Sequence, residues 1–231
     1  MPRGLGLALQ KAVAREGLDE DLEGQGRSLA NARRRQVFRY LCLRPCARVG
    51  DLARDLAMSQ ATARWHIWIL IEHGYLQAEG TRVFPRGLIN PDDASLFAML
   101  ASTGRASTFA TTFESPGTSL KELSERVHLT RQSASKIASE LVQFGLVTLS
   151  EDGRYRRLYP TELLAKRREA NRSRAAAFAD SLIQRLAEEG LSPELLRRGD
   201  GILLIRFGAG PLRVVLEVPL DPYATVWMGR A

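Results

Sequence analysis

The sequence predicts a mainly α-helical chain with small β wings, in which one small fold occurs twice. Shifting the chain by 71 residues superimposes residues of the same character. The matched pairs are Phe38 with Phe109, Pro45 with Pro116, Leu52 with Leu123, Ala63 with Ala134, Leu70 with Leu141 and Gly74 with Gly145. Because the matches fall at hydrophobic and turn positions while the surface differs, they indicate two copies of one fold.

In the first copy, apolar residues at helical spacing predict three helices, over 31–43, 51–57 and 60–73. Pro45 stops the first helix, Ser59 is placed to cap the third, and Gly74 ends it. Two short stretches, 75–78 and 82–84, then predict a small hairpin.

The second copy repeats this order. Helices are predicted over 105–113, 120–127 and 131–144, followed by a hairpin that turns at Asp152-Gly153. Three helices followed by a β-hairpin make a winged helix. We therefore expect two tandem winged helix-turn-helix domains, over 28–90 and 91–160.

The charge of the chain is concentrated in the first copy. The net charge is +7, and residues 28–90 hold 10 arginines against 4 acidic residues. Residues 91–160 hold 8 basic and 8 acidic residues, so they are neutral overall. A concentrated positive field attracts a polyanion such as DNA.

The start of the third helix resembles a known family signature. The first copy reads Met58-Ser59-Gln60-Ala61-Thr62-Ala63-Arg64-Trp65-His66, followed by Leu70 and Gly74. This run resembles ArsR-like and MarR-like repressors, and archaeal regulators of this type often carry a Trp-His pair. The corresponding run of the second copy, from Leu129 to Lys136, resembles the MarR-like form of this signature. Over 28–160, the resemblance implies a DNA-binding transcriptional regulator.

The third helix of each copy carries candidate DNA contacts, because the N-terminal residues of this helix reach base edges in such motifs. A solvated helix start is the alternative, since Ser and Thr are common there in any case. Basic wing residues ordinarily contact phosphate or enter the minor groove. The DNA-binding candidates are Ser59, Gln60, Thr62, Arg64, Arg82 and Arg86 in the first copy, and Thr130, Arg131, Gln132, Ser133, Ser135, Lys136, Arg154 and Arg156 in the second.

The third helix of the first copy is unusual, because it is apolar around nearly its whole circumference from Trp65 to Ile71. A surface helix should keep one side polar. Trp68 or Ile69 is therefore expected to pack against the second winged helix, the C-terminal part or a second subunit. His66 is expected to be a packed core residue.

The remaining segments lie outside the repeat. Residues 1–27 mix glycine with alternating charge and predict a flexible N-terminal arm. Residues 161–190 predict one long helix, capped by Thr161 and ended by Gly190. Its apolar second half, which contains Phe178, either forms a homodimer interface or packs on the chain's own domains. Strands over 202–207, 212–218 and 224–228, the first two joined through 208–211, complete a small α+β region that dimerises, binds an unknown small-molecule effector or caps the core.

No catalytic pattern is found: the chain has no phosphate-binding glycine motif and no nucleophile elbow. We expect a non-enzyme that uses no metal or cofactor, and we interpret Cys42 and Cys46 as buried small hydrophobes. No apolar run reaches the length of a membrane helix, so a cytoplasmic, nucleoid-associated protein is expected. Two alternatives share the fold: a chromatin protein that coats DNA, and a protein-interaction module as in condensin accessory subunits.

Overall fold

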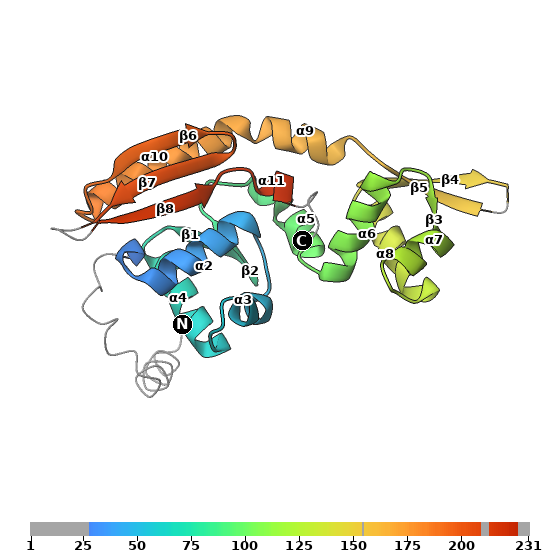
Figure 1. The fold of residues 1–231 in the computed structure, drawn as a ribbon, viewed down its shortest axis with the longest axis horizontal. Coiled ribbons are helices and arrows are strands. Elements are labelled where there is room, and N and C mark those ends of the chain that lie inside the picture. The colour runs from blue at the N-terminus through green and yellow to red at the C-terminus, as the bar shows by residue number, and fades with distance from the viewer. Residues whose placement is uncertain (1–27, 154, 209–212, 226–231) are drawn as a thin grey trace. The chain divides into compact units, whose positions relative to one another are not determined.

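The computed structural model describes residues 28–153, 155–208 and 213–225, and these are mainly helical with small antiparallel sheets (Figure 1). The predicted N-terminal arm and Arg154 lie outside the described residues. The described chain divides into two compact units. The first unit contains residues 28–89 and 174–220, and the second contains 90–173 and 221–225.

The first unit begins with three helices and a hairpin in the predicted order. Asn31 caps the first helix, and its side chain accepts a hydrogen bond from the Arg34 amide. In the hairpin, Leu76 pairs with Pro85 and Glu79 pairs with Arg82. The elements are η2 (Ser28–Ala30), α2 (Ala32–Leu43), α3 (Val49–Asp55), α4 (Gln60–Glu72), β1 (Leu76–Glu79) and β2 (Arg82–Pro85).

The second unit contains the same order after two short leading elements. Ser119 caps α7 in a capping box: its hydroxyl accepts from the Glu122 amide, and the Glu122 carboxylate accepts from the Ser119 amide. The sheet has the order β3-β5-β4. The elements are η3 (Pro91–Asp93), α5 (Ala94–Leu100), α6 (Thr103–Glu114), β3 (Thr118–Ser119), α7 (Leu120–Arg126), α8 (Arg131–Gln143), β4 (Val147–Asp152) and β5 (Tyr155–Pro160).

The internal repeat extends to the bounds of the helices. Adding 71 to the first and last residues of α2, α3 and α4 gives those of α6, α7 and α8. Four of the matched pairs, such as Phe38 with Phe109, are buried in both units. Gly74 and Gly145 follow the third helix with φ of 72° and 71°, a left-handed conformation that glycine adopts without strain. The same local signals therefore produce the same helices in both copies.

The long helix predicted over 161–190 is divided. The structure contains α9 (Leu163–Ala170) and α10 (Arg172–Glu188), separated at Asn171. Thr161 was expected as the N-cap, but Glu162 occupies that position. The Thr161 hydroxyl instead donates to the carbonyl of Gly145 at 2.6 Å, so it ties α9 to the end of α8.

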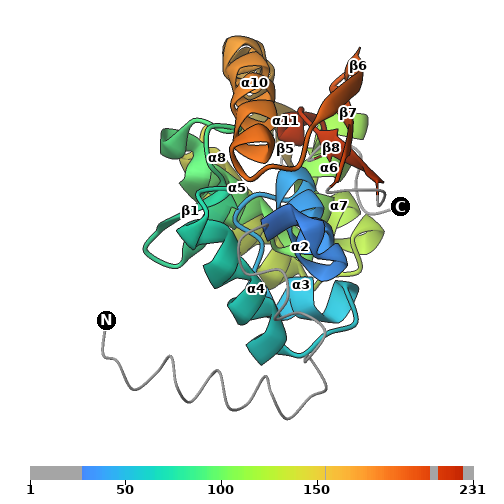
Figure 2. The same ribbon diagram turned by 90° about the vertical axis from the view of Figure 1, so that its left-hand side faces the viewer.

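The apolar face of α10 is covered within the first unit. Phe178, Leu182 and Leu186 are buried, and the ring of Phe178 stacks on that of Phe38 with centroids 6.4 Å apart. Figure 2 shows α10 beside the three-stranded sheet of this unit. Of the two expectations for this face, packing on the chain's own domains is confirmed, because α2 and its neighbours cover it.

The C-terminal sheet differs in part from the prediction. It has the order β6-β7-β8, with β6 (Glu194–Gly199), β7 (Ile202–Phe207) and β8 (Val214–Pro219). Strand β6 was not predicted: it is an exposed edge strand, without alternation of apolar and polar residues. Residues 209–212, which include part of the predicted turn, lie outside the described residues.

The prediction of a strand over 224–228 was wrong for residues 224 and 225, which the structure describes as helical. Residues 222–225 form the short helix α11 (Pro222–Thr225), and 226–228 lie outside the described residues. Asp221 accepts a hydrogen bond from the Ala224 amide at 3.1 Å, and Pro222 begins the helix. Asp before Pro is a helix-start signal that overrides the weak strand pattern here.

A buried polar group holds α11 in the second unit, so the predicted separate region 161–231 is divided between the two units. The Tyr223 hydroxyl donates to the buried Asp93 carboxylate at 2.6 Å. Arg167 of α9 pairs with the other oxygen of Asp93. Arg168 pairs with Asp221 at 2.6 Å. These long-range contacts have no signal in the local sequence pattern.

Candidate nucleic-acid interface

The start of α4 has the local geometry expected of a capped helix. The Thr62 amide donates to the Ser59 hydroxyl at 3.0 Å, and the two hydroxyl oxygens lie 2.8 Å apart. Thr62 is buried while Ser59 is exposed. Thr62 was expected to contact DNA, but it faces inward and supports the cap. Gln60 is exposed, and its side chain lies against Gly50 of α3, close to where a Cβ there would sit.

The outer face of α4 carries Gln60, Arg64 and Trp68 in one row. All three are exposed, and the spacing of four residues places them along one side of the helix. The inner face carries Ala63, His66 and Leu70, which are buried. The core role expected for His66 is therefore confirmed by its burial. Of the two residues expected to pack against another part of the protein or a second subunit, Trp68 is 45% exposed within the chain, whereas Ile69 is half-buried.

Six of the ten arginines between 28 and 90 are held by other groups of the first unit. Ion pairs hold three of them, and backbone carbonyls of Leu56, Ser28, Leu29 and Ala30 accept from the other three. A paired or carbonyl-bound guanidinium offers less charge to an outside partner. The ion-paired arginines are Arg39, Arg44 and Arg54, and the carbonyl-bound ones are Arg33, Arg34 and Arg35.

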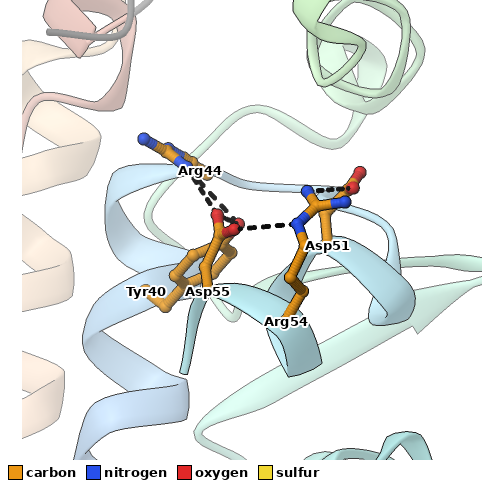
Figure 3. A network of polar contacts seen from close by, with 5 residues as sticks. All are labelled: Tyr40, Arg44, Asp51, Arg54 and Asp55. Carbon is orange, nitrogen blue, oxygen red and sulfur yellow. Dashed lines mark hydrogen bonds and ion pairs between the residues drawn. The ribbon is translucent and has the colours of Figure 1, made fainter. Parts of the chain in front are cut away.

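Figure 3 shows how Arg44 and Arg54 are neutralised. The Asp55 carboxylate accepts from Arg44 at 3.0 Å and from the Tyr40 hydroxyl at 2.9 Å. Arg54 pairs with Asp51 at 2.7 Å and reaches Asp55 at 3.4 Å. Two arginines and two aspartates therefore balance one another on α3 and the end of α2.

The other four arginines of the first copy are exposed, and none makes an ion pair or side-chain hydrogen bond with any residue that the structure describes. They occupy the N-cap position of α3, the outer face of α4, and the hairpin β1–β2 with the residue that follows it. These are the parts of a helix-turn-helix with a wing that approach DNA. We call Arg48, Arg64, Arg82 and Arg86 the free-arginine set.

The start of α8 is more polar than that of α4. Thr130 caps it, accepting from the Ser133 amide at 3.1 Å and donating to the Ser133 hydroxyl at 2.9 Å. Further along, the Arg105 guanidinium pairs with Glu140, and hydrogen bonding to Arg105 lowers the pKa of that carboxyl. The candidates on this helix, all exposed, are Arg131, Gln132, Ser133, Ser135 and Lys136.

The second hairpin carries less free charge than its sequence suggests. Arg157 pairs with Asp152 at 2.6 Å and also donates to the Gly117 carbonyl at 3.0 Å. Arg156 lies 3.8 Å from Glu151, its cross-strand neighbour. Arg154 lies outside the described residues. The acidic residues of β4 thus offset basic residues of β5.

Arg48 is the member of the free-arginine set that sequence reasoning missed. The second helix was predicted to begin at Asp51, but α3 begins at Val49. Arg48 is therefore the N-cap residue of α3, and its side chain makes no capping hydrogen bond. The signal that could have found it is a basic residue directly before the first helix of the helix-turn-helix pair.

The structure also bears on other classes of site. In the part of the chain that the structure describes, no group of three His, Cys, Asp or Glu side chains is placed to hold a metal ion. Among the same residues, no helix is both long and apolar enough to cross a membrane. Cys42 and Cys46 are free and buried, as expected.

No protein-family model matches the sequence, and no curated protein matches it. Parts of the chain are similar to three bacterial structures. MepR, a transcription regulator of the Staphylococcus aureus multidrug efflux pump MepA, is 18% identical over 38% of this chain and 68% of its own, with a TM-score of 0.27. PcaV, a transcriptional regulator from Streptomyces coelicolor, is 19% identical over 61% and 82%, with a TM-score of 0.28. ScpB from Mycobacterium tuberculosis is 17% identical over 58% and 93%, with a TM-score of 0.24. Structural similarities this low do not indicate a function, so the proposal below depends on the geometry of the candidate interface.

Proposed function

We propose that the chain is a transcriptional regulator that binds double-stranded DNA through two winged helices, with α4 and α8 as recognition helices. One observation carries the proposal. Among the residues that the structure describes, the arginines of the first copy without an ion pair or side-chain hydrogen bond are those of the free-arginine set, which occupies the start of α3, the outer face of α4 and the hairpin. Of the paired arginines, Arg39 lies beside Glu217 of the C-terminal sheet, whereas Arg54 lies on α3 beside Asp51.

The two recognition helices have different chemistry. α4 combines Gln60 and Arg64, and a bidentate pair of such side chains with a purine discriminates by about 1–3 kcal/mol. α8 begins with Arg131 and Gln132 in a unit of balanced charge. Base contacts need matched donors and acceptors rather than net charge. The second copy is therefore assigned to base discrimination, and the first to both affinity and discrimination.

The experiment is the salt dependence of binding to a generic duplex, followed by fluorescence anisotropy. Each lost phosphate contact lowers the slope of log affinity against log salt concentration by about 0.9. The double variant Arg64→Ala with Arg82→Ala should therefore lose between one and two units of slope and bind more weakly.

The matched control removes the same charge from paired arginines of the same unit. Arg39 pairs with Glu217, and Arg206 pairs with Glu194 at 3.2 Å. The variant Arg39→Ala with Arg206→Ala should keep the wild-type slope. Equal effects in the two double variants would show that only net charge matters, and the assignment of the interface would be wrong.

The homodimer expected from the sequence remains a prediction. The apolar face of α10, which motivated it, is covered within the first unit. Two winged helices in one chain offer two contacts to one duplex. Light scattering of the wild-type protein, alone and with DNA, gives the number of copies in each complex.

A further inference from the structure

The exposed face of α4 includes a large apolar side chain that the proposed polar contacts do not use. Trp68 is 45% exposed, and it follows Arg64 by four residues on the same side of the helix. Four residues advance an α-helix by about 6 Å. A surface that meets Gln60 and Arg64 therefore meets Trp68 next.

The indole of Trp68 is held in place by its neighbour. The rings of Trp65 and Trp68 stack with centroids 5.1 Å apart and an interplanar angle of 29°. Trp65 itself is half-buried. A stacked pair of this kind restricts the rotation of the exposed ring, so the apolar surface that it presents is fixed before any partner binds.

The surroundings of Trp68 favour a small apolar target over a protein interface. On the outer face of α4, Arg64 precedes it and Glu72 follows it, and both are exposed. A stable protein interface buries about 1,200 Å² or more in total, which one indole bounded by charged residues does not provide. The major groove of DNA presents one kind of apolar group, the methyl group of thymine.

We infer that Trp68 contacts a thymine methyl group in the major groove, about two base pairs along from the base that Arg64 meets. This inference rests on the proposed function, because it takes α4 as a recognition helix. It adds a base preference that neither Gln60 nor Arg64 can supply, since hydrogen-bonding groups do not recognise a methyl group.

The test compares two 30-base-pair duplexes of alternating sequence, one of dA and dT and the other of dA and dU, at one salt concentration. The duplexes differ in the 5-methyl group. From the free energy of burying one methyl-sized group, the wild-type protein should bind the thymine duplex about three- to tenfold more tightly. Trp68→Ala should remove this preference, and Trp68→Phe should keep most of it.

Two controls separate the inference from the proposed function. Arg64→Ala should weaken binding to both duplexes and keep the preference for thymine. Val215→Ala, which truncates an exposed apolar residue of β8 in the same unit, should change neither affinity. Thermal unfolding of each variant checks that the fold is intact.

Each outcome decides the inference. Equal binding of both duplexes by the wild type, with the salt-slope effect of Arg64 and Arg82 intact, would overturn the thymine contact and leave the proposed function standing. A preference that survives in Trp68→Ala would also overturn it. If the wild type binds neither duplex, both the proposed function and the inference fail.

Discussion

Gly74 gives the sharpest test of how α10 supports the end of α4 in the first unit. Its φ is 72°, and a Cβ built there would lie 2.4 Å from Nη1 of Arg185. That guanidinium of α10 donates to the His73 carbonyl at 2.8 Å, at the end of α4, and lies 5.6 Å above the ring of Tyr75. Gly145, the equivalent residue of the second copy, has the same φ, but its Cβ would meet only Leu163 at 3.5 Å.

The magnitude follows from this difference. Alanine in the left-handed conformation costs about 1 kcal/mol, so Gly145→Ala should lower the free energy of unfolding by about that amount. Gly74→Ala should cost the same strain and also displace the Arg185 guanidinium. A hydrogen bond to a charged group contributes about 1.5–3 kcal/mol, so with the strain we expect a total of about 2.5–4 kcal/mol.

A double-mutant cycle measures the coupling. In the Arg185→Ala background the steric conflict is absent, so Gly74→Ala should cost only the strain of about 1 kcal/mol, as Gly145→Ala does. In a Trp227→Phe background, denaturant unfolding followed by tryptophan fluorescence reports the first unit, which contains Trp65 and Trp68. Hydrogen-exchange mass spectrometry reports the second unit for Gly145→Ala. Additive effects of Gly74→Ala and Arg185→Ala would refute the reasoning, because they would show that Arg185 is not held against the end of α4.

Two further predictions concern buried ionisable groups of the first unit. Glu189 lies beside His73 and accepts a hydrogen bond from the Ser28 amide, and its burial raises the pKa of its carboxyl. The folded state therefore keeps this carboxyl protonated to a higher pH than the unfolded chain does. The stability that this proton contributes is lost as the pH rises above about 4.5. Glu189→Gln should show a smaller loss of stability over that range in urea unfolding, and an unchanged pH profile would contradict the burial. Burial also raises the pKa of the Cys46 thiol to about 12 and that of the Cys42 thiol well above its usual value. Neither thiol should react with iodoacetamide at pH 8 in the native protein, whereas the chain in denaturant should take up two equivalents of iodoacetamide.

The sequence by itself determined the repeated parts of this protein. The helices of the two copies, their caps at Ser59 and Thr130, and the glycines at 74 and 145 follow from local signals, because capping, periodicity and left-handed turns depend on residues close together in the chain. The candidate residues on α4 and α8 could be predicted for the same reason, with the exception of the inward-facing Thr62.

The tertiary structure alone decided which charges and faces remain available. Ten arginines in the first copy predicted a positive surface, but residues that the structure describes hold six of them and leave the free-arginine set. One of the six, Arg39, is held by a residue distant in sequence, Glu217. The sequence left two places for Phe178, a dimer interface or the chain's own domains, and its stacking on Phe38 of α2 shows the second. Ion pairs and packing between distant segments depend on how the chain returns on itself, and a local pattern does not contain that information.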